Sequence, residues 1–358
     1  MFVAIAAIVG LLVGVAPAQA ATPSYVALGD SYSSGLGTRS YLNDGTSCMR
    51  SVYAYPSLLA ADRGMSLSLR ACSGARISDV RTAQLPALSA GTSYVTISVG
   101  GNDAGFVDVL TECAKPAWMS DCYGRINQAE SIVRNQLPSQ LSSLYAEIKA
   151  RAPQAKVTVV GYPRLFNGTD CSWFTWFSSQ EMSRLNGTAD LLNSVTRNAA
   201  ASSGIGFADP TRAFTGHAVC DRTEWLNGLS VPVSESFHPN RSGHASGYLP
   251  VVAPSAPVAS PLALTSAEQT GSASAESGTV GSTMNPATQT AALTADARRF
   301  TVTDRAIVPE TIARVDLHSP AARAAAARAG VNVDDRASVD AADRIWSQRQ
   351  AAAAAAAE

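Results

Sequence analysis

The chain has 358 residues, of which 46% are hydrophobic and 15% charged, and its formal net charge at pH 7 is −1. The apolar fraction is enough for a packed core, which excludes a wholly disordered chain, and the length fits one or two domains. The near-zero charge argues against nucleic acid as a partner, because binding phosphates requires a basic surface.

The first segment has the pattern of an export signal. Residues 2–16 form an apolar run without a charged side chain, and the small residues Ala18 and Ala20 follow it. The run is too short for a bilayer span, which needs about 20 residues, and the small residues fit a signal peptidase site before Ala21. We therefore expect residues 1–20 to be a signal peptide, rather than a buried first strand or helix, and the protein to be secreted into the extracellular medium. No later segment of the sequence is long and apolar enough to span a membrane.

Strand and helix patterns alternate from residue 24 onwards. Apolar or β-branched runs predict four strands, over residues 25–28, 94–99, 156–160 and 204–209. Near-continuous apolar runs indicate strands that are buried on both faces, as in a parallel sheet.

Two helical patterns separate these strands. Apolar residues recur at spacings of three and four over residues 126–148 and over residues 182–201. Pro138 interrupts the first pattern and predicts a kink or two separate helices. The alternation predicts an α/β fold, a three-layer α/β/α sandwich with a central, mostly parallel sheet. Reactive groups are expected at the carboxyl ends of the strands of such a sheet.

The composition changes after Pro250, where Ala, Ser, Thr, Pro and Gly dominate. We expect a globular domain over residues 21–250, a linker over residues 251–294 and an Ala/Arg-rich tail over residues 295–358. The tail has too few apolar residues for a core of its own, so we expect it to be disordered or partly helical. An attachment module is the alternative interpretation of the tail.

All six cysteines lie within the predicted globular domain: Cys48, Cys72, Cys113, Cys122, Cys171 and Cys220. An even number of cysteines in an exported protein predicts three disulfides. Spacing alone cannot choose among the possible pairings, but the sequential one closes the shortest loops and is preferred: Cys48–Cys72, Cys113–Cys122 and Cys171–Cys220. A zinc site is the rival interpretation, and the sequence has no CxxC pair to support it.

A candidate nucleophile follows the first predicted strand, in the sequence Gly29-Asp30-Ser31. A serine on a strand-to-helix turn projects its hydroxyl over the edge of the sheet, where a base can reach it. On its own, however, such a tripeptide is more often a turn or a helix N-cap.

The candidate base is His238, in the sequence Ser236-Phe237-His238-Pro239. A neutral imidazole is the ordinary base for a serine nucleophile, because its pKa lies near neutral pH. Pro239 suits the first turn of a helix, which would fix the position of His238. The other histidines, His217, His244 and His318, are weaker candidates.

Two turns of small residues fit an oxyanion hole, which needs rigid N–H donors beside the nucleophile. Residues 71–75 form a turn in which Gly74 lets the backbone approach a substrate closely. Asn102, in Gly100-Gly101-Asn102-Asp103, offers a side-chain amide at a strand end. For Asp103 we prefer a turn or N-cap role to a catalytic one.

Together these segments resemble the ordered sequence blocks of the SGNH (GDSL) hydrolase family. The similarity covers roughly residues 24–250 and is greatest to the secreted actinobacterial lipases and phospholipases with three disulfides. It implies a flavodoxin-like α/β/α sandwich and the sequential disulfide pairing. It also implies Ser31 as nucleophile and His238 as base, with the Ser31 N–H, Gly74 and Asn102 as oxyanion donors, and no cofactor or metal.

The group that orients His238 has two candidates. Members of this family usually have an Asp three residues before the histidine, where this chain has Glu235. In the branch that this chain resembles, a backbone carbonyl two residues before the histidine can do the same work, and that residue is Ser236. The Ser236 carbonyl is slightly preferred, because the SFHPN sequence is more typical of that branch.

The sequence predicts a secreted serine ester hydrolase that acts alone, as a monomer, on an ester substrate. Residues 171–177 place four aromatic side chains beside a predicted disulfide, either as a lining for acyl chains or a lipid contact, or as ordinary packing. This segment is the one feature that favours lipid esters, for a lipase, esterase or phospholipase. A polysaccharide or small-ester deacetylase is the alternative within the family, and a cell-surface binding protein on the same scaffold is the non-enzyme alternative.

Overall fold

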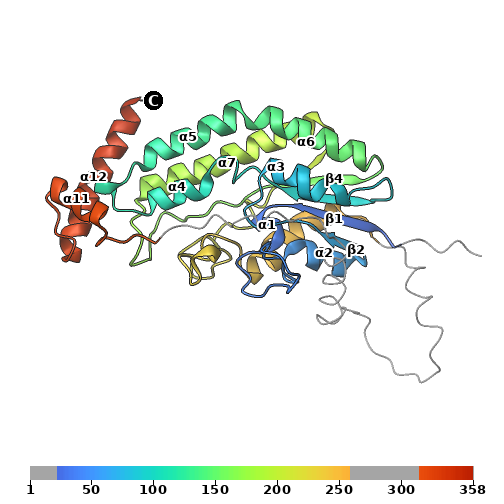
Figure 1. The fold of residues 1–358 in the computed structure, drawn as a ribbon, viewed down its shortest axis with the longest axis horizontal. Coiled ribbons are helices and arrows are strands. Elements are labelled where there is room, and N and C mark those ends of the chain that lie inside the picture. Colours follow the sequence, from blue (N-terminus) through green and yellow to red (C-terminus); the bar gives the residue numbers. More distant parts are fainter. Residues whose placement is uncertain (1–21, 259–313, 358) are drawn as a thin grey trace, which may run out of the picture.

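The computed structural model describes residues 22–258 and 314–357. A parallel five-stranded sheet with the order β2-β1-β3-β4-β5 forms its centre, and helices cover both faces (Figure 1). The predicted α/β/α sandwich is confirmed. The strands are β1 (Ser24–Gly29), β2 (Ser66–Leu69), β3 (Tyr94–Ser98), β4 (Lys156–Val160) and β5 (Gly206–Ala208).

The α-helices and the shorter helical turns alternate with these strands along the chain. The α-helices are α1 (Ser31–Ser34), α2 (Tyr55–Arg63), α3 (Ile77–Asp79), α4 (Phe106–Cys113), α5 (Cys122–Asn135), α6 (Leu137–Arg151), α7 (Ser179–Ser202), α8 (Leu249–Val252), α11 (Pro320–Ala329) and α12 (Arg336–Ala357). The turns are η1 (Val80–Gln84), η2 (Leu85–Ala87), η3 (Ala117–Met119), η4 (Val233–Glu235), η5 (Gly243–Tyr248) and η6 (Ala253–Ser255).

Strand β1 shows how the sheet forms two hydrophobic layers. Side chains alternate between the faces of a strand. Tyr25 and Ala27 therefore belong to one core cluster, while Val26 and Leu28 belong to the other. All four are nearly inaccessible to solvent, which explains the uninterrupted apolar run in the sequence.

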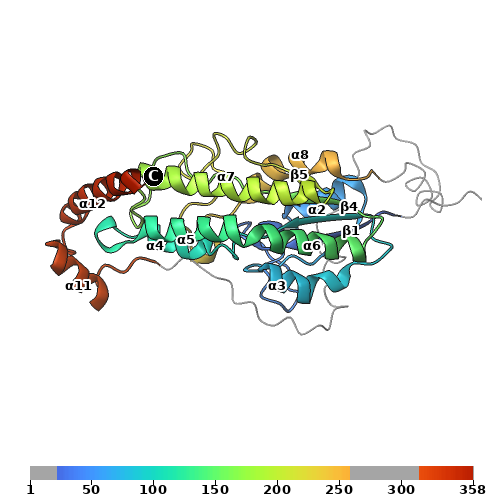
Figure 2. The same cartoon turned by 90° about the horizontal axis from the view of Figure 1, so that it is seen from above.

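Helices α5 and α6 follow each other end to end on one side of the sheet, and the long helix α7 runs beside both (Figure 2). The break predicted at Pro138 is confirmed, because α5 ends at Asn135 and Pro138 lies in the first turn of α6. Proline is tolerated at that position, since the first N–H groups of a helix have no acceptor within it.

The edge strand β2 has no counterpart among the predicted strands. Its sequence, Ser-Leu-Ser-Leu, is short and only half buried, so it lacks the apolar run that marked the central strands. It pairs with β1 in parallel register, from Ser24 opposite Ser66 to Ala27 opposite Leu69.

The globular domain continues a few residues past the predicted boundary at residue 250, because α8 and η6 extend it as far as residue 255. Val252 is inaccessible to solvent, and Ser255 Oγ lies 2.5 Å from the Tyr94 hydroxyl of β3. Leu249 and Val251 pack against the same core. Burial of these apolar side chains thus keeps residues 249–255 in the domain despite the prolines among them. The predicted signal peptide and most of the predicted linker lie outside the described residues.

The tail has a defined structure over residues 314–357, where it forms α11 and α12 beyond the ends of α5 and α7 (Figures 1 and 2). The tail packs on the globular domain rather than around a core of its own. Ala326 and Val339 share a small hydrophobic cluster with Trp118 and Trp176 of the globular domain, and Trp346 of the tail packs against the same cluster.

The three disulfides join the cysteines in sequential order, as preferred from the sequence. Cys113–Cys122 links the end of α4 to the start of α5. Cys48–Cys72 is buried beside Ala75, and Cys171–Cys220 joins two loops.

The revised boundary makes a prediction for truncated proteins. A chain ending at residue 258 keeps Val252 and Ser255, whereas a chain ending at residue 250 loses both. Because burying a valine side chain contributes about 2 kcal/mol, we expect the shorter chain to melt roughly 4–8 °C lower. Thermal unfolding followed by circular dichroism measures the difference, and equal melting temperatures would restore the boundary at residue 250.

Candidate active site

The Ser31 side chain lies at the start of α1, directly after β1. Gly29 ends that strand with φ of +124°, and a Cβ there would approach the Ser98 carbonyl oxygen to 2.3 Å. Only glycine permits so close an approach to β3. Gln84 then fixes the turn, because its side chain accepts from the Gly29 N–H (2.7 Å) and donates to the Gly29 carbonyl (2.8 Å). Gln84 was not predicted from the sequence, since a single Gln in a helical stretch carries no signal.

Asp30 is the N-cap residue of α1, and its side chain is buried. Its carboxylate accepts from the Tyr32 N–H (3.0 Å), the Tyr162 hydroxyl (2.6 Å) and the Ser98 hydroxyl (3.3 Å). Burial raises the pKa of Asp30 to about 7, and these donors partly oppose the shift. The bonds tie the turn before Ser31 to the loop after β4 and so hold the serine in place.

The structure brings Ser31 and His238 together across 207 positions of sequence. His238 Nε2 lies 2.8 Å from Ser31 Oγ, and His238 Nδ1 lies 2.8 Å from the Ser236 carbonyl oxygen. A carbonyl can only accept, so the hydrogen bond places the imidazole proton on Nδ1. The Nε2 lone pair is therefore free to accept the proton of the serine hydroxyl.

His238 is held by strand-like pairing, and the predicted helix start at Pro239 is wrong. Asn227 donates its N–H to the His238 carbonyl (2.9 Å) and accepts the Phe237 N–H (2.9 Å), and Pro239 forms an isolated bridge with Leu226. The next helical residue is Arg241. Pairing with residues 226–227 thus replaces the helix turn as the support of the imidazole.

Tyr32 connects the serine turn to the histidine loop. Its hydroxyl donates to the Phe237 carbonyl (2.7 Å), and its ring lies 5.2 Å from the His238 ring. Phe237 has φ of 60°, a conformation that a bulky residue rarely adopts. Tyr32 and Asn227 therefore stabilise the backbone turn that aims both the Ser236 carbonyl and the His238 ring. Tyr32 also lines the cavity beside Ser31, whereas Asn227 carried no signal in the sequence.

The Glu235 side chain is buried but is not hydrogen-bonded to His238. Its Oε1 accepts from the Tyr41 hydroxyl (2.5 Å), and its Oε2 lies 3.3 Å from Arg39 Nε. Of the two candidate orienting groups, the structure places the Ser236 carbonyl on His238 Nδ1. Glu235 instead joins the loop after α1 to the histidine loop.

The two oxyanion candidates lie on neighbouring turns. Asn102 Nδ2 donates one hydrogen to the Ala75 carbonyl (3.0 Å), and the residue lines the same cavity as Ser31. Gly74, with φ of +79°, precedes Ala75 but is not among the residues that line the cavity. The Cys48–Cys72 disulfide and the bond from the Ser73 N–H to the Cys48 carbonyl (3.0 Å) hold this turn. Asp103, as expected, has a structural role and accepts from the Ile77 N–H.

A largely apolar cavity opens beside Ser31, Asn102 and His238 and encloses about 680 Å³ of empty space, its open mouth included. Its apolar walls come from α4, from α7 and from the loops on either side: Phe106, Val107, Leu110, Leu165, Ala189, Leu192, Val233 and Phe237. Polar groups at one end and aliphatic side chains along the walls suit a molecule with one reactive polar group and an apolar chain.

The remaining histidines are not in the site. His244 is buried and its Nδ1 accepts from the Tyr55 N–H (3.2 Å), while His217 stacks on Trp225. His318 lies on the exposed surface of the tail, 3.4 Å from Asp334.

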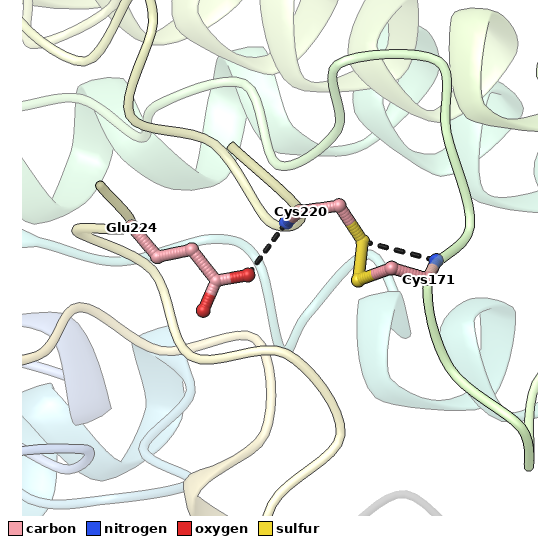
Figure 3. A group of neighbouring side chains, drawn as sticks. All are labelled: Cys171, Cys220 and Glu224. Carbon is pink, nitrogen blue, oxygen red and sulfur yellow. Dashed lines mark hydrogen bonds between the residues drawn. A yellow bond between two sulfur atoms is a disulfide. The ribbon is translucent and has the colours of Figure 1, made fainter. Parts of the chain in front are cut away.

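One group of possible metal ligands occurs among the described residues, Cys171, Cys220 and Glu224 (Figure 3). Both sulfurs are already bonded to each other, so neither is a thiolate. Glu224 Oε1 accepts from the Cys220 N–H (2.6 Å), and this bond stabilises Cys220 at its positive φ of 70°. We interpret the group as a capped disulfide. Within residues 22–258 and 314–357, no helix is both long and apolar enough to cross a bilayer.

Comparison with known proteins identifies the family. Residues 27–245 match the GDSL-like Lipase/Acylhydrolase family. This chain belongs to that family. It is 44% identical to "Lipase 1" of Streptomyces coelicolor over 248 residues, which are 67% of this chain and 91% of that protein.

Two crystal structures extend the similarity. An extracellular lipase from Streptomyces rimosus has a TM-score of 0.62 and 41% identity, and a phospholipase A1 from Streptomyces albidoflavus has a TM-score of 0.62 and 42% identity. Each match covers 66% of this chain and 100% of the crystallised chain. The similarity shows that this chain is a GDSL hydrolase and that its activity is the hydrolysis of esters.

The environment of His238 predicts the pH dependence of hydrolysis. Burial lowers the pKa of His238 to about 4, while the hydrogen bond to the Ser236 carbonyl acts in the opposite direction. The imidazole can accept a proton only when neutral, so kcat/KM for a soluble ester should decline as the pH falls through about 4. Initial rates between pH 3 and 9 test this, with intrinsic fluorescence at each pH to exclude unfolding. A half-maximal point near pH 6.5, the value of a free imidazole, would contradict it.

Proposed function

We propose that this protein is a secreted lipase in which Ser31 is the nucleophile and His238 the general base. The observation that carries the proposal is the 2.8 Å contact between Ser31 Oγ and His238 Nε2 at the polar end of an apolar cavity. Nucleophile and base within hydrogen-bond distance, with a third group orienting the base, form the arrangement that acyl transfer requires.

In the first half-reaction, Ser31 Oγ attacks the ester carbonyl carbon while its proton moves to His238 Nε2. The negative charge that develops on the carbonyl oxygen is held by the Ser31 N–H, the Gly74 N–H and the Asn102 amide. The imidazolium then gives its proton to the departing alcohol, which leaves an acyl group on Ser31. A water molecule, deprotonated by His238, releases the acid and restores the serine.

The Ser236 carbonyl takes the place of a triad carboxylate in this mechanism. It fixes the tautomer of His238 through Nδ1, and its dipole stabilises the imidazolium once it forms. Glu235 supports the loop through Tyr41 and Arg39 and has no direct part in the proton transfer.

A lipid ester is the substrate class that the cavity favours over an acetylated polysaccharide. The aliphatic and aromatic walls suit an acyl chain, whereas an acetyl group would leave most of that surface unused. The printed names of the relatives, lipase and phospholipase A1, are consistent with this choice. We further propose that the protein works outside the cell as a monomer, with three disulfides that suit an oxidising environment.

Two substitutions test the assignment of the residues. Ser31→Ala should lose at least about 10³-fold in kcat and all labelling by a fluorophosphonate probe, because the nucleophile is gone. Glu235→Gln, which keeps a partner for Tyr41, should lower kcat less than about tenfold, because the Ser236 carbonyl and not Glu235 orients His238. Removing a true orienting acid can cost about 10⁴-fold. Strong labelling of Ser31→Ala would favour a non-catalytic role for Ser31, and a loss in Glu235→Gln close to 10⁴-fold would restore the glutamate as the orienting acid.

The cavity wall predicts the dependence on acyl length. Ala189 of α7 lines the cavity and is 4% exposed. Ala189→Phe should lower kcat/KM for long-chain esters at least about tenfold, because the ring fills space that the chain needs, with less than about a threefold loss on acetyl esters. The matched control is Ala201→Phe, at an exposed position of the same helix. Wild-type activity confined to acetyl esters would instead favour the deacetylase.

A further inference from the structure

The tail helices lie on a surface of the globular domain formed by η3 and by residues 171–177, which we call the aromatic loop. Trp118 in η3 and Trp176 in the aromatic loop are 7% and 8% exposed. Both pack against Ala326 of α11 and Val339 of α12. The tail therefore covers two tryptophans of the domain.

Polar contacts fix α12 to η3. The Asp343 carboxylate accepts from the Ala117 N–H (2.8 Å). Gln350 Nε2 donates to the carbonyls of Ala117 (2.9 Å) and Ser120 (3.0 Å). These bonds satisfy backbone groups at η3. Together with the apolar contact, they fix the position of α12 along this surface.

A second set of contacts connects α12 to the aromatic loop. Asp340 accepts from the Trp176 indole N–H (3.1 Å) and from Arg336 Nε (2.7 Å). The Arg336 guanidinium lies 5.0 Å from the Trp173 ring centre and 4.7 Å from that of Trp176, and it also donates to the Trp173 carbonyl. One arginine thus holds the loop at two tryptophans through cation–π contacts and a hydrogen bond.

In the aromatic loop, two aromatic side chains face the solvent and a third faces the globular domain. Trp173 and Phe174 are 71% and 68% exposed. Phe177 points inwards and contacts Phe237, with ring centres 5.8 Å apart, and Phe237 lines the cavity beside His238. The aromatic loop therefore contacts the wall of the cavity through Phe177 and Phe237.

The tail is absent from the crystallised relatives. The whole of the Streptomyces rimosus lipase chain corresponds to 66% of this chain, and the family match ends at residue 245. The contacts of α11 and α12 with the aromatic loop are thus an addition to the hydrolase domain.

We propose that α11 and α12 hold the aromatic loop in the conformation that presents Trp173 and Phe174 to a lipid surface. The inference rests on the proposed lipid substrate. A Trp–Phe pair is suited to the boundary between water and acyl chains. The same loop contacts Phe237 of the cavity wall through Phe177, so binding there would bring the cavity close to the surface from which the ester is taken. Holding the loop in advance reduces the conformational entropy lost on binding.

The test uses the full chain and three single substitutions. Arg336→Ala removes the contacts to the loop, Trp173→Ala removes the lipid contact itself, and Arg328→Ala is the control, at an exposed position of α11. Sedimentation with phosphatidylcholine vesicles measures binding, and kcat/KM on a short-chain ester below its micellar concentration measures the chemistry. We expect binding to weaken roughly three- to tenfold in Arg336→Ala and more in Trp173→Ala. The soluble-ester activity of Arg336→Ala should stay within about twofold of wild type, and Arg328→Ala should match wild type in both assays.

The outcomes separate this inference from the proposed function. Equal vesicle binding by Arg336→Ala and Arg328→Ala overturns the role of the tail, and unchanged binding by Trp173→Ala overturns the lipid contact. Binding of the wild type to insoluble xylan or cellulose, but not to vesicles, would assign the aromatic pair to a polysaccharide. If the wild type fails to hydrolyse the soluble ester, the proposed function itself is wrong. Asp340→Asn, which also weakens the hold on Trp176, replaces Arg336→Ala should that variant fold poorly.

Discussion

The contact between Ser31 and His238 is the interaction on which the active site depends. Its two partners are 207 positions apart in the sequence. Both side chains are short, so they meet only if the backbone of each is held in place. The serine is fixed by β1, by the glycine that lets β1 approach β3, and by the Asp30 cap. The histidine is fixed by its pairing with Asn227. Tyr32 joins the two supports directly, since it follows the serine and donates to the peptide before the histidine.

The orienting group of this site is neutral. A carbonyl on His238 Nδ1 fixes the tautomer without placing a negative charge beside the ring. Without a nearby carboxylate to favour the imidazolium, burial dominates and the pKa of His238 is lowered. The imidazole is therefore almost entirely in its neutral form at neutral pH. In the proposed mechanism, this comes at the cost of a weaker hold on the proton taken from the serine.

Much of this architecture follows from local patterns in the sequence. The buried strands, the break at Pro138 and the position of Ser31 at a strand end depend on neighbouring residues, and all three were predicted. The pairing of His238 with residues 226–227 depends on contacts that no local pattern records, so the helix start expected at Pro239 was wrong. The direction of the Glu235 side chain likewise depends on Tyr41 and Arg39, far away in the sequence. The tail was interpreted from its own composition, whereas the domain supplies the tryptophans on which it packs.

The Cys48–Cys72 bond has a consequence for where the enzyme can work. It is buried beside the turn that carries Gly74, so one covalent cross-link supports the backbone that we propose as part of the oxyanion hole. Before oxidation, that turn is held by hydrogen bonds alone, and the thiol state of the surrounding medium then governs how firmly it is shaped. A chain with reduced cysteines would thus carry a looser Gly74 turn than the same chain with its disulfide formed.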